Sequence, residues 1–129
     1  MNIHLDHINK KAHIPCLEVI LNEKNKIEDK YKDISFVLIG GCFYCEEIDE
    51  EIKFLKNKNL NEIIFDNTYH GFTGIPKNHW DYLFFQEKNT KNITVSKSKV
   101  LKNESIINEL NHHFISDHFP VYAEFSISN

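Results

Sequence analysis

Apolar residues recur at helical spacing in two segments of the chain. Lys10 to Lys26 is predicted to be a helix whose apolar face consists of Ile14, Leu17, Ile20 and Leu21. Pro15 falls in its first turns, where a missing backbone N–H is tolerated. Glu46 to Lys56 is predicted to be a second helix, with acidic residues in its first turn and an apolar face of Ile48, Ile52 and Leu55.

Other segments have the pattern of strands. Ser35 to Ile39 is a continuous apolar run bounded by Gly40-Gly41, as in a strand buried on both faces. Val121 to Ile127 alternates, so we expect Val121, Ala123, Phe125 and Ile127 to face inward and Tyr122, Glu124 and Ser126 outward. The remaining strand predictions are Asn2–Asp6, Glu62–Phe65, Trp80–Phe85 and Ile93–Leu101.

The order of these elements predicts the fold class. Glu28 to Asp33 and Asp66 to Lys77 are predicted connections, and Ser105 to Asn111 a short helical piece. Strands and helices interleave first, and strands dominate later, which indicates an α/β (α+β) fold with a mixed sheet and helices on one face. Without repeats or a linker, residues 1–129 are expected to form one domain.

Composition narrows the possible partners. The chain has 129 residues, 41% of them hydrophobic, which is enough for a core. Its net charge is −4 and its 15 basic residues are all lysines. Because arginine is the usual bidentate phosphate ligand, this composition argues mildly against a dedicated nucleic-acid binder.

Three cysteines, Cys16, Cys42 and Cys45, do not suggest a disulfide framework. No run has the length of a membrane span, and no signal peptide is evident. Cytoplasm or nucleus is therefore the default expectation. Met1 leads directly into a predicted strand, which suggests a truncated product, a fragment or a wrongly assigned start.

Ser116-Asp117-His118 is the strongest chemical signal. It stands in a tight turn that leads into an alternating strand. An Asp beside a His at the mouth of a strand can hold a metal with the Asp and move protons with the His. A plain surface turn is the alternative interpretation.

Asp81 is an acid within the otherwise apolar segment Trp80–Phe85. A buried carboxylate needs a partner, and His118 is a candidate, since an Asp–His pair fixes the imidazole tautomer. The alternative is an acid on the exposed face of the strand. Near the N-terminus, His4 and Asp6 share one face of a predicted strand, which is equally compatible with a solvated edge.

A loop rich in glycine and aromatic residues is a candidate for lining a substrate cleft. It contains Asn67, Tyr69, His70 and Phe72. Loops of this composition are a weak signal by themselves.

Taken together, five segments resemble the endonuclease/exonuclease/phosphatase (deoxyribonuclease-I-like) superfamily in order and spacing. They are Asn2-Ile-His-Leu-Asp-His7, Phe36 to Tyr44, Thr68-Tyr-His-Gly-Phe72, Trp80-Asp-Tyr-Leu-Phe84 and Ser116-Asp-His-Phe-Pro120. The resemblance covers essentially the whole chain and matches the C-terminal half of such a domain. It implies half of a four-layer α/β/β/α sandwich.

The resemblance also implies a function. Such enzymes are Mg²⁺-dependent phosphoesterases, in which an activated water attacks the phosphorus atom of a nucleic acid or another phosphate ester. By resemblance, Asp117 is a metal ligand, His118 is the catalytic histidine oriented by Asp81, and His4 is a second proton-handling group near the phosphate.

Two departures from the family pattern predict impaired catalysis. Cys42 stands where the family has the Asp that handles the nucleophile, and Tyr44 stands where it has an Asn. A neutral thiol accepts a proton poorly and does not suit Mg²⁺. The family's first half, with its metal-binding Glu, is absent from this sequence. We therefore expect the missing half, or self-association through an exposed apolar sheet face, to complete the structure.

Three other interpretations remain open. Cys42-Phe-Tyr-Cys45 is a C-x-x-C segment between a strand and a helix, as in thioredoxin-like enzymes. Cys42 and Cys45 with His112-His113 are a poorly spaced zinc pattern. A non-catalytic remnant that binds a partner is the strongest alternative.

Overall fold

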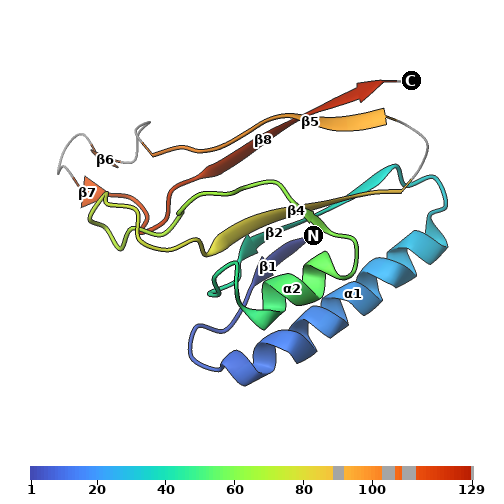
Figure 1. Cartoon of the computed structure of the whole chain (residues 1–129), viewed down its shortest axis with the longest axis horizontal. Helices are drawn as coiled ribbons and strands as arrows, with labels where there is room; N and C mark the ends of the chain where they lie inside the picture. Colours follow the sequence, from blue (N-terminus) through green and yellow to red (C-terminus); the bar gives the residue numbers. More distant parts are fainter. Residues whose placement is uncertain (89–91, 103–106, 109–112, 129) are drawn as a thin grey trace.

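A mixed four-stranded sheet forms the centre of the computed structural model, which describes residues 1–88, 92–102, 107–108 and 113–128 (Figure 1). The strand order is β1-β2-β4-β3, where β1 is Asn2–His4, β2 Phe36–Cys42, β3 Asn61–Glu62 and β4 Asp81–Glu87. β1 and β2 are parallel, and β4 is antiparallel to both β2 and β3.

Both helices lie on one face of this sheet (Figure 1). A short 3-10 helix, η1 (Lys10–Ala12), leads into α1 (His13–Lys30), and α2 is Glu50–Lys56. The largest core cluster joins them to the sheet and includes Leu17, Leu21, Ile39, Ile52, Leu55 and Phe84. The structure thus has a helix in each of the two segments where apolar residues recur at helical spacing. In the part of the chain that the structure describes, no helix is long and apolar enough to cross a membrane.

The opposite face of the sheet is covered in part by a long antiparallel pair, β5 (Asn92–Val100) and β8 (Val121–Ser128) (Figure 1). A second core cluster lies between the two layers, and it contains Leu38, Leu83, Phe85, Ile93, Val95, Ala123 and Phe125. A third pair joins β6 (Ile107–Asn108) to β7 (His113–Phe114). The sheet face expected to be bare is therefore partly covered by the chain's own strands.

Several predicted helix boundaries are wrong. The first helix continues to Lys30, so the first half of the expected connection Glu28–Asp33 is helical. The second helix begins at Glu50, because Glu46 to Asp49 forms a turn in which the Asp49 carboxylate accepts the Glu46 N–H at 2.9 Å. Ile48 precedes the helix and is 77% exposed, so it does not belong to the apolar face.

Strand boundaries differ as well. β1 ends at His4 rather than Asp6, and β3 is Asn61–Glu62, so it shares only Glu62 with the predicted strand Glu62–Phe65. Within the predicted helical piece Ser105–Asn111, Ile107–Asn108 form strand β6, and the other residues lie outside those described. The alternation of β8 is confirmed except at Ile127, which was expected to face inward but is 55% exposed.

Gly40 and Gly41 do not end the second strand as expected but belong to it, since β2 continues to Cys42. Gly41 has φ +141°, and a Cβ built there would lie 1.8 Å from the carbonyl oxygen of Ile3. Only glycine lets β1 approach this closely. The glycine therefore brings His4 next to Cys42.

We expect Gly41→Ala to lower the free energy of unfolding by about 3 kcal/mol or more, because it adds backbone strain to a clash with backbone atoms. Gly40→Ala is the matched control, since its Cβ meets the movable Cδ1 of Leu83 at 2.9 Å. It should cost about 1 kcal/mol. Urea denaturation measures both values, and equal losses would contradict the close approach of β1.

Candidate active site

Three chemically active side chains form a row across the sheet at the ends of β1 and β2. His4 pairs in register with Cys42, and Cys42 pairs with Asp81. Residues directly opposite one another in paired strands project from the same face of a sheet. Two residues away along β2 and β4, Gly40 and Leu83 are paired, so the row continues the face that β5 and β8 cover in part.

His118 reaches this row from the turn that precedes β8. Its Nδ1 lies 2.6 Å from Oδ2 of Asp81. A carboxylate accepts, so Nδ1 carries the hydrogen and Nε2 remains for other partners. Asp117 lies beside it, with Oδ1 4.0 Å from Nε2, which is too long for a hydrogen bond. The predicted contact between Asp81 and His118 is therefore present.

A buried loop holds the two partners in place. Thr68 is fully buried, and its hydroxyl accepts the backbone N–H of Asp81 at 2.9 Å. Its carbonyl accepts the N–H of Phe119 at 2.7 Å, and the carbonyl of Asp117 accepts the N–H of His70 at 2.9 Å. Thr68 thus links the strand that carries Asp81 to the turn that carries His118. Thr68 was not among the site residues predicted from the sequence.

A cleft of about 550 Å³ adjoins the Asp81–His118 pair. Its charged walls carry the carboxylates of Glu46, Asp49 and Asp117 and the ammonium group of Lys10. The remaining lining comprises His7, Tyr44, Cys45, Tyr69, Asn78, Trp80 and His118. With three carboxylates and one ammonium group, the cleft is not built to attract a bare phosphate anion.

Tyr44 packs its ring among others at this cleft. The ring centroid lies 5.3 Å from those of His4 and Trp80 and 5.7 Å from that of His7. The backbone of Tyr44 has φ +51°, a left-handed conformation that Asn adopts more readily than bulky residues do. A large aromatic side chain therefore occupies a backbone position suited to asparagine.

Cys42 and Cys45 are both free and buried. Burial is the largest cause that raises the pKa of the Cys42 thiol, to about 11, and the nearby negative charges of Asp81 and Asp117 raise it further. Burial also raises the pKa of Cys45. The late start of α2, at Glu50, leaves neither thiol at a helix N-terminus. These features argue against the thioredoxin-like alternative, which needs a lowered thiol pKa.

We expect iodoacetamide at pH 8 to modify the exposed Cys16 but neither Cys42 nor Cys45. At three pH units below its pKa, only about one Cys42 thiol in a thousand is ionised. Labelling of Cys42 should increase as the pH rises toward 11, provided that circular dichroism shows the fold intact. Peptide mass spectrometry measures each site, and equal labelling of Cys16 and Cys42 at pH 8 would contradict this environment.

The four predicted residues of the aromatic-glycine loop differ in whether they line the cleft. Tyr69 lines the cleft and stacks on Trp80 at 4.3 Å, whereas Asn67, His70 and Phe72 are not among the lining residues. His70 is fully buried against Phe119, and burial lowers its pKa. Phe72 is 59% exposed. The roles predicted for all these residues stay predictions.

The described residues do not by themselves fit a Mg²⁺ centre. Mg²⁺ prefers oxygen ligands in octahedral geometry. Asp117 belongs to no group of three metal-ligating side chains among the described residues, and the Glu46 carboxylate already accepts from the side-chain amide of Asn78 at 2.8 Å. Among the residues that the structure describes, the one group of three metal-ligating side chains is Cys42, Asp81 and His118, whose donor atoms lie within 4.8 Å of one another.

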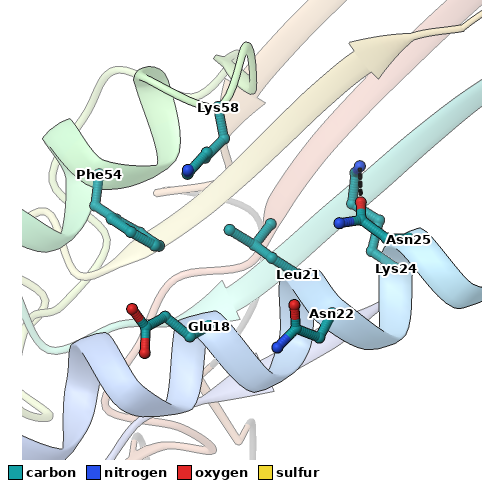
Figure 2. Close-up of a pocket in the computed structure, with 7 residues that line it drawn as sticks. All are labelled: Glu18, Leu21, Asn22, Lys24, Asn25, Phe54 and Lys58. Carbon is teal, nitrogen blue, oxygen red and sulfur yellow. Dashed lines mark hydrogen bonds between the residues drawn. The ribbon is translucent and has the colours of Figure 1, made fainter.

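A second cavity, of about 390 Å³, lies between α1 and the end of α2 (Figure 2). Its side chains come from both helices and, for Lys58, from the turn after α2, and Lys24 donates to the Asn25 amide oxygen at 3.3 Å. Lys24 also pairs with Glu28 at 2.9 Å, so its charge is compensated. Glu18 is its one carboxylate, and no histidine or cysteine lines it. This cavity carries no comparable chemistry.

Three solved structures share the fold of the chain. An endonuclease/exonuclease/phosphatase family protein from Bacteroides thetaiotaomicron superimposes with a TM-score of 0.74 at 20% identity, over 96% of this chain and 48% of its own. The chain has the fold of half an endonuclease/exonuclease/phosphatase protein. That share is consistent with the C-terminal half predicted from the sequence.

The other two structures agree with this endonuclease/exonuclease/phosphatase fold. A mannosyl-6-phosphatase from B. thetaiotaomicron gives a TM-score of 0.75 at 20% identity, over 97% of this chain and 49% of its own. A conserved protein of unknown function from Enterococcus faecalis gives 0.74 at 24% identity, over 98% and 49%. The chain thus spans about half the length of the structures it matches. No protein-family model and no curated protein matches the sequence.

Proposed function

We propose that the chain is one half of a metal-dependent phosphoesterase site and is catalytically impaired by itself. The observation that carries this proposal is the 2.6 Å contact between Asp81 and His118 beside a cleft that Asp117 also lines. A carboxylate-oriented imidazole is a proton-transfer device. In this assignment His118 moves the proton, Asp81 fixes its tautomer, and His4 stands two strands away from Asp81 in the same row.

The proposed impairment has two causes. Cys42 replaces a carboxylate with a buried thiol whose pKa is about 11, so it does not accept a proton at neutral pH. The Tyr44 ring, packed against His4 and Trp80, takes up the corner where an asparagine side chain would leave space. The left-handed backbone of residue 44 supports an asparagine ancestor at this position.

A second half is proposed to complete both the sandwich and the metal site. The chain covers 48–49% of its structural neighbours. Among the described residues, β5 and β8 form a layer of two strands opposite a four-stranded sheet. Mg²⁺ held by Asp117 would take further oxygen ligands from that half, because Asp117 belongs to no group of three metal-ligating side chains among the described residues. A four-layer α/β/β/α sandwich is the expected complete architecture.

A non-catalytic, partner-binding remnant is the second candidate function. It is favoured by Tyr44, whose ring makes contacts with three other rings and so closes the catalytic corner rather than leaving it open. The two candidates differ in what a complementary half does. It restores turnover to an impaired enzyme but only binds to a remnant.

The direct test is turnover by the purified chain in the presence of Mg²⁺. We expect weak Mg²⁺ binding and no hydrolysis of bis(4-nitrophenyl) phosphate above background. Mannose 6-phosphate is a useful second probe, because one structural neighbour is a mannosyl-6-phosphatase. Turnover by the wild-type chain that His118→Ala abolishes would refute the proposed impairment.

A further inference from the structure

We propose that Cys42, Asp81 and His118 form a binding site for Zn²⁺, which the chain takes in preference to Mg²⁺. The inference goes beyond the proposed function and does not depend on phosphoester turnover. The sulfur and nitrogen donors of Cys42 and His118 do not match the oxygen ligands that Mg²⁺ requires. A thiolate, an imidazole and a carboxylate are all established Zn²⁺ ligands.

The geometry needs little change to accept the ion. The three donor atoms lie within 4.8 Å of one another. With Zn–N and Zn–O bonds of about 2.0–2.1 Å and a Zn–S bond of about 2.3 Å, tetrahedral ligands lie roughly 3.3–3.6 Å apart. Closing the site therefore takes side-chain movements of about 1 Å, within the reach of rotamer adjustment.

The backbone holds the three donors in advance. Cys42 and Asp81 are directly paired on neighbouring strands, so their side chains leave the same face of the sheet. The Thr68 hydroxyl fixes the backbone N–H of Asp81, and a bridge between Tyr69 and His118 fixes the third ligand. A preformed site loses less side-chain entropy when the ion binds.

The ion would take the place of the hydrogen between Nδ1 of His118 and Oδ2 of Asp81, which are 2.6 Å apart and would separate to coordinate the same ion. The neutral imidazole would then carry its hydrogen on Nε2, and the Cys42 thiol would release its proton to solvent as the ion binds. The Asp81 and His118 side chains keep 16% and 19% exposure, so the site is open to solvent from one side. Three protein ligands and an open fourth position are the pattern of a site that also holds a water or a ligand atom.

The negative charge around the site also favours a cation. Asp81 is itself a ligand, and Asp117 stands next to His118 with its carboxylate 4.0 Å from Nε2. The nearest ammonium group lining the adjoining cleft is that of Lys10, which pairs with Asp49 at 3.8 Å. The cleft therefore offers a divalent cation a net attraction.

The test uses the untagged, reduced full chain, with Zn²⁺ affinity measured by competition with a chromophoric chelator and Co²⁺ used as a spectroscopic probe. We expect one tight Zn²⁺ per chain, no displacement by a large excess of Mg²⁺, and a thiolate-to-cobalt charge-transfer absorption. Cys42→Ser should remove that absorption and weaken Zn²⁺ binding by about 100-fold or more. Cys16→Ser is the matched control, because Cys16 is exposed and away from the site, and it should bind like wild type.

Two further variants keep the outcome decisive if Cys42→Ser does not fold. Asp81→Asn should weaken Zn²⁺ binding by about 100-fold, whereas Asp117→Asn, at the position expected to serve Mg²⁺, should weaken it by no more than about 10-fold. A cobalt complex without a thiolate band would overturn the proposal. So would Zn²⁺ affinity that is unchanged in Asp81→Asn, or a stronger effect of Asp117→Asn than of Asp81→Asn.

Discussion

Glu51→Ala is expected to lower the free energy of unfolding by about 1–3 kcal/mol, because it leaves Nδ1 of His13 buried without its hydrogen-bond partner. Glu51 lies on α2 with its side chain 5% exposed, and its Oε1 is 2.8 Å from Nδ1 of His13. Nε2 of His13 is 2.7 Å from the carbonyl oxygen of Asp6. Both ring nitrogens of His13 are thus engaged, one by the buried Glu51 carboxyl group and one by a backbone carbonyl.

This pair connects three segments that are distant in sequence. His13 begins α1, Glu51 lies in the first turn of α2, and Asp6 lies in the loop that follows β1. That loop leads from His4 to His7 and Lys10 at the cleft. Loss of the pair should therefore loosen the cleft wall as well as the helices.

Glu23→Ala is the matched control for this prediction. Glu23 pairs with Lys26 at 2.6 Å on the surface, with both side chains more than half exposed, so its loss should change stability by about 0.5 kcal/mol at most. Urea denaturation at neutral pH measures both. Equal effects of Glu51→Ala and Glu23→Ala would show that the buried pair is not formed. Replacing both partners by apolar residues should cost much less than Glu51→Ala.

The sequence predicted the elements of the fold better than their ends. Apolar spacing identified α1 correctly, because Leu17 and Leu21 are buried on one face. It failed at Ile48, since the Asp49 carboxylate closes a turn that delays the helix to Glu50. It also failed at Gly41, because a glycine that ends a strand and one that permits a close strand neighbour have the same local pattern.

In the candidate site, too, some contacts could be predicted from the sequence and others could not. An acid in an apolar strand requires a partner, which made the contact between Asp81 and His118 predictable. The contact between Thr68 and Asp81 and the pair of His13 and Glu51 were not predictable. Their partners are 13 and 38 positions apart in sequence, respectively, and meet only in the three-dimensional fold. Cys42 was interpreted as a loss for Mg²⁺ chemistry, and only the register with Asp81 shows that it joins another donor set.

Restoring the family residues in this chain alone should not restore activity. Cys42→Asp with Tyr44→Asn returns a carboxylate and an amide, but not the proposed second half of the site. Each missing proton-handling group typically costs about 10²–10⁴-fold in rate. We therefore expect turnover of bis(4-nitrophenyl) phosphate only when the double variant is combined with a complementary N-terminal half.

The N-terminal half of the B. thetaiotaomicron endonuclease/exonuclease/phosphatase family protein is a practical complement. This chain matches 48% of that protein with a TM-score of 0.74, and the remainder would supply the proposed missing half. Co-elution as a one-to-one complex establishes that the halves dock. The wild-type chain in the same complex is the control, and it should be slower than the double variant by about 100-fold or more. Equal rates would show that Cys42 and Tyr44 do not impair the site.

The most direct test of the half-site is the dependence of this reconstituted turnover on His118. In a complex of confirmed stoichiometry with Mg²⁺, the double variant should hydrolyse the diester, and adding His118→Ala should reduce the rate by about 10²–10⁴-fold without dissociating the halves. A docked complex that remains inactive, or one whose turnover is unchanged by His118→Ala, would contradict the assignment of Asp81 and His118 as half of a phosphoesterase site.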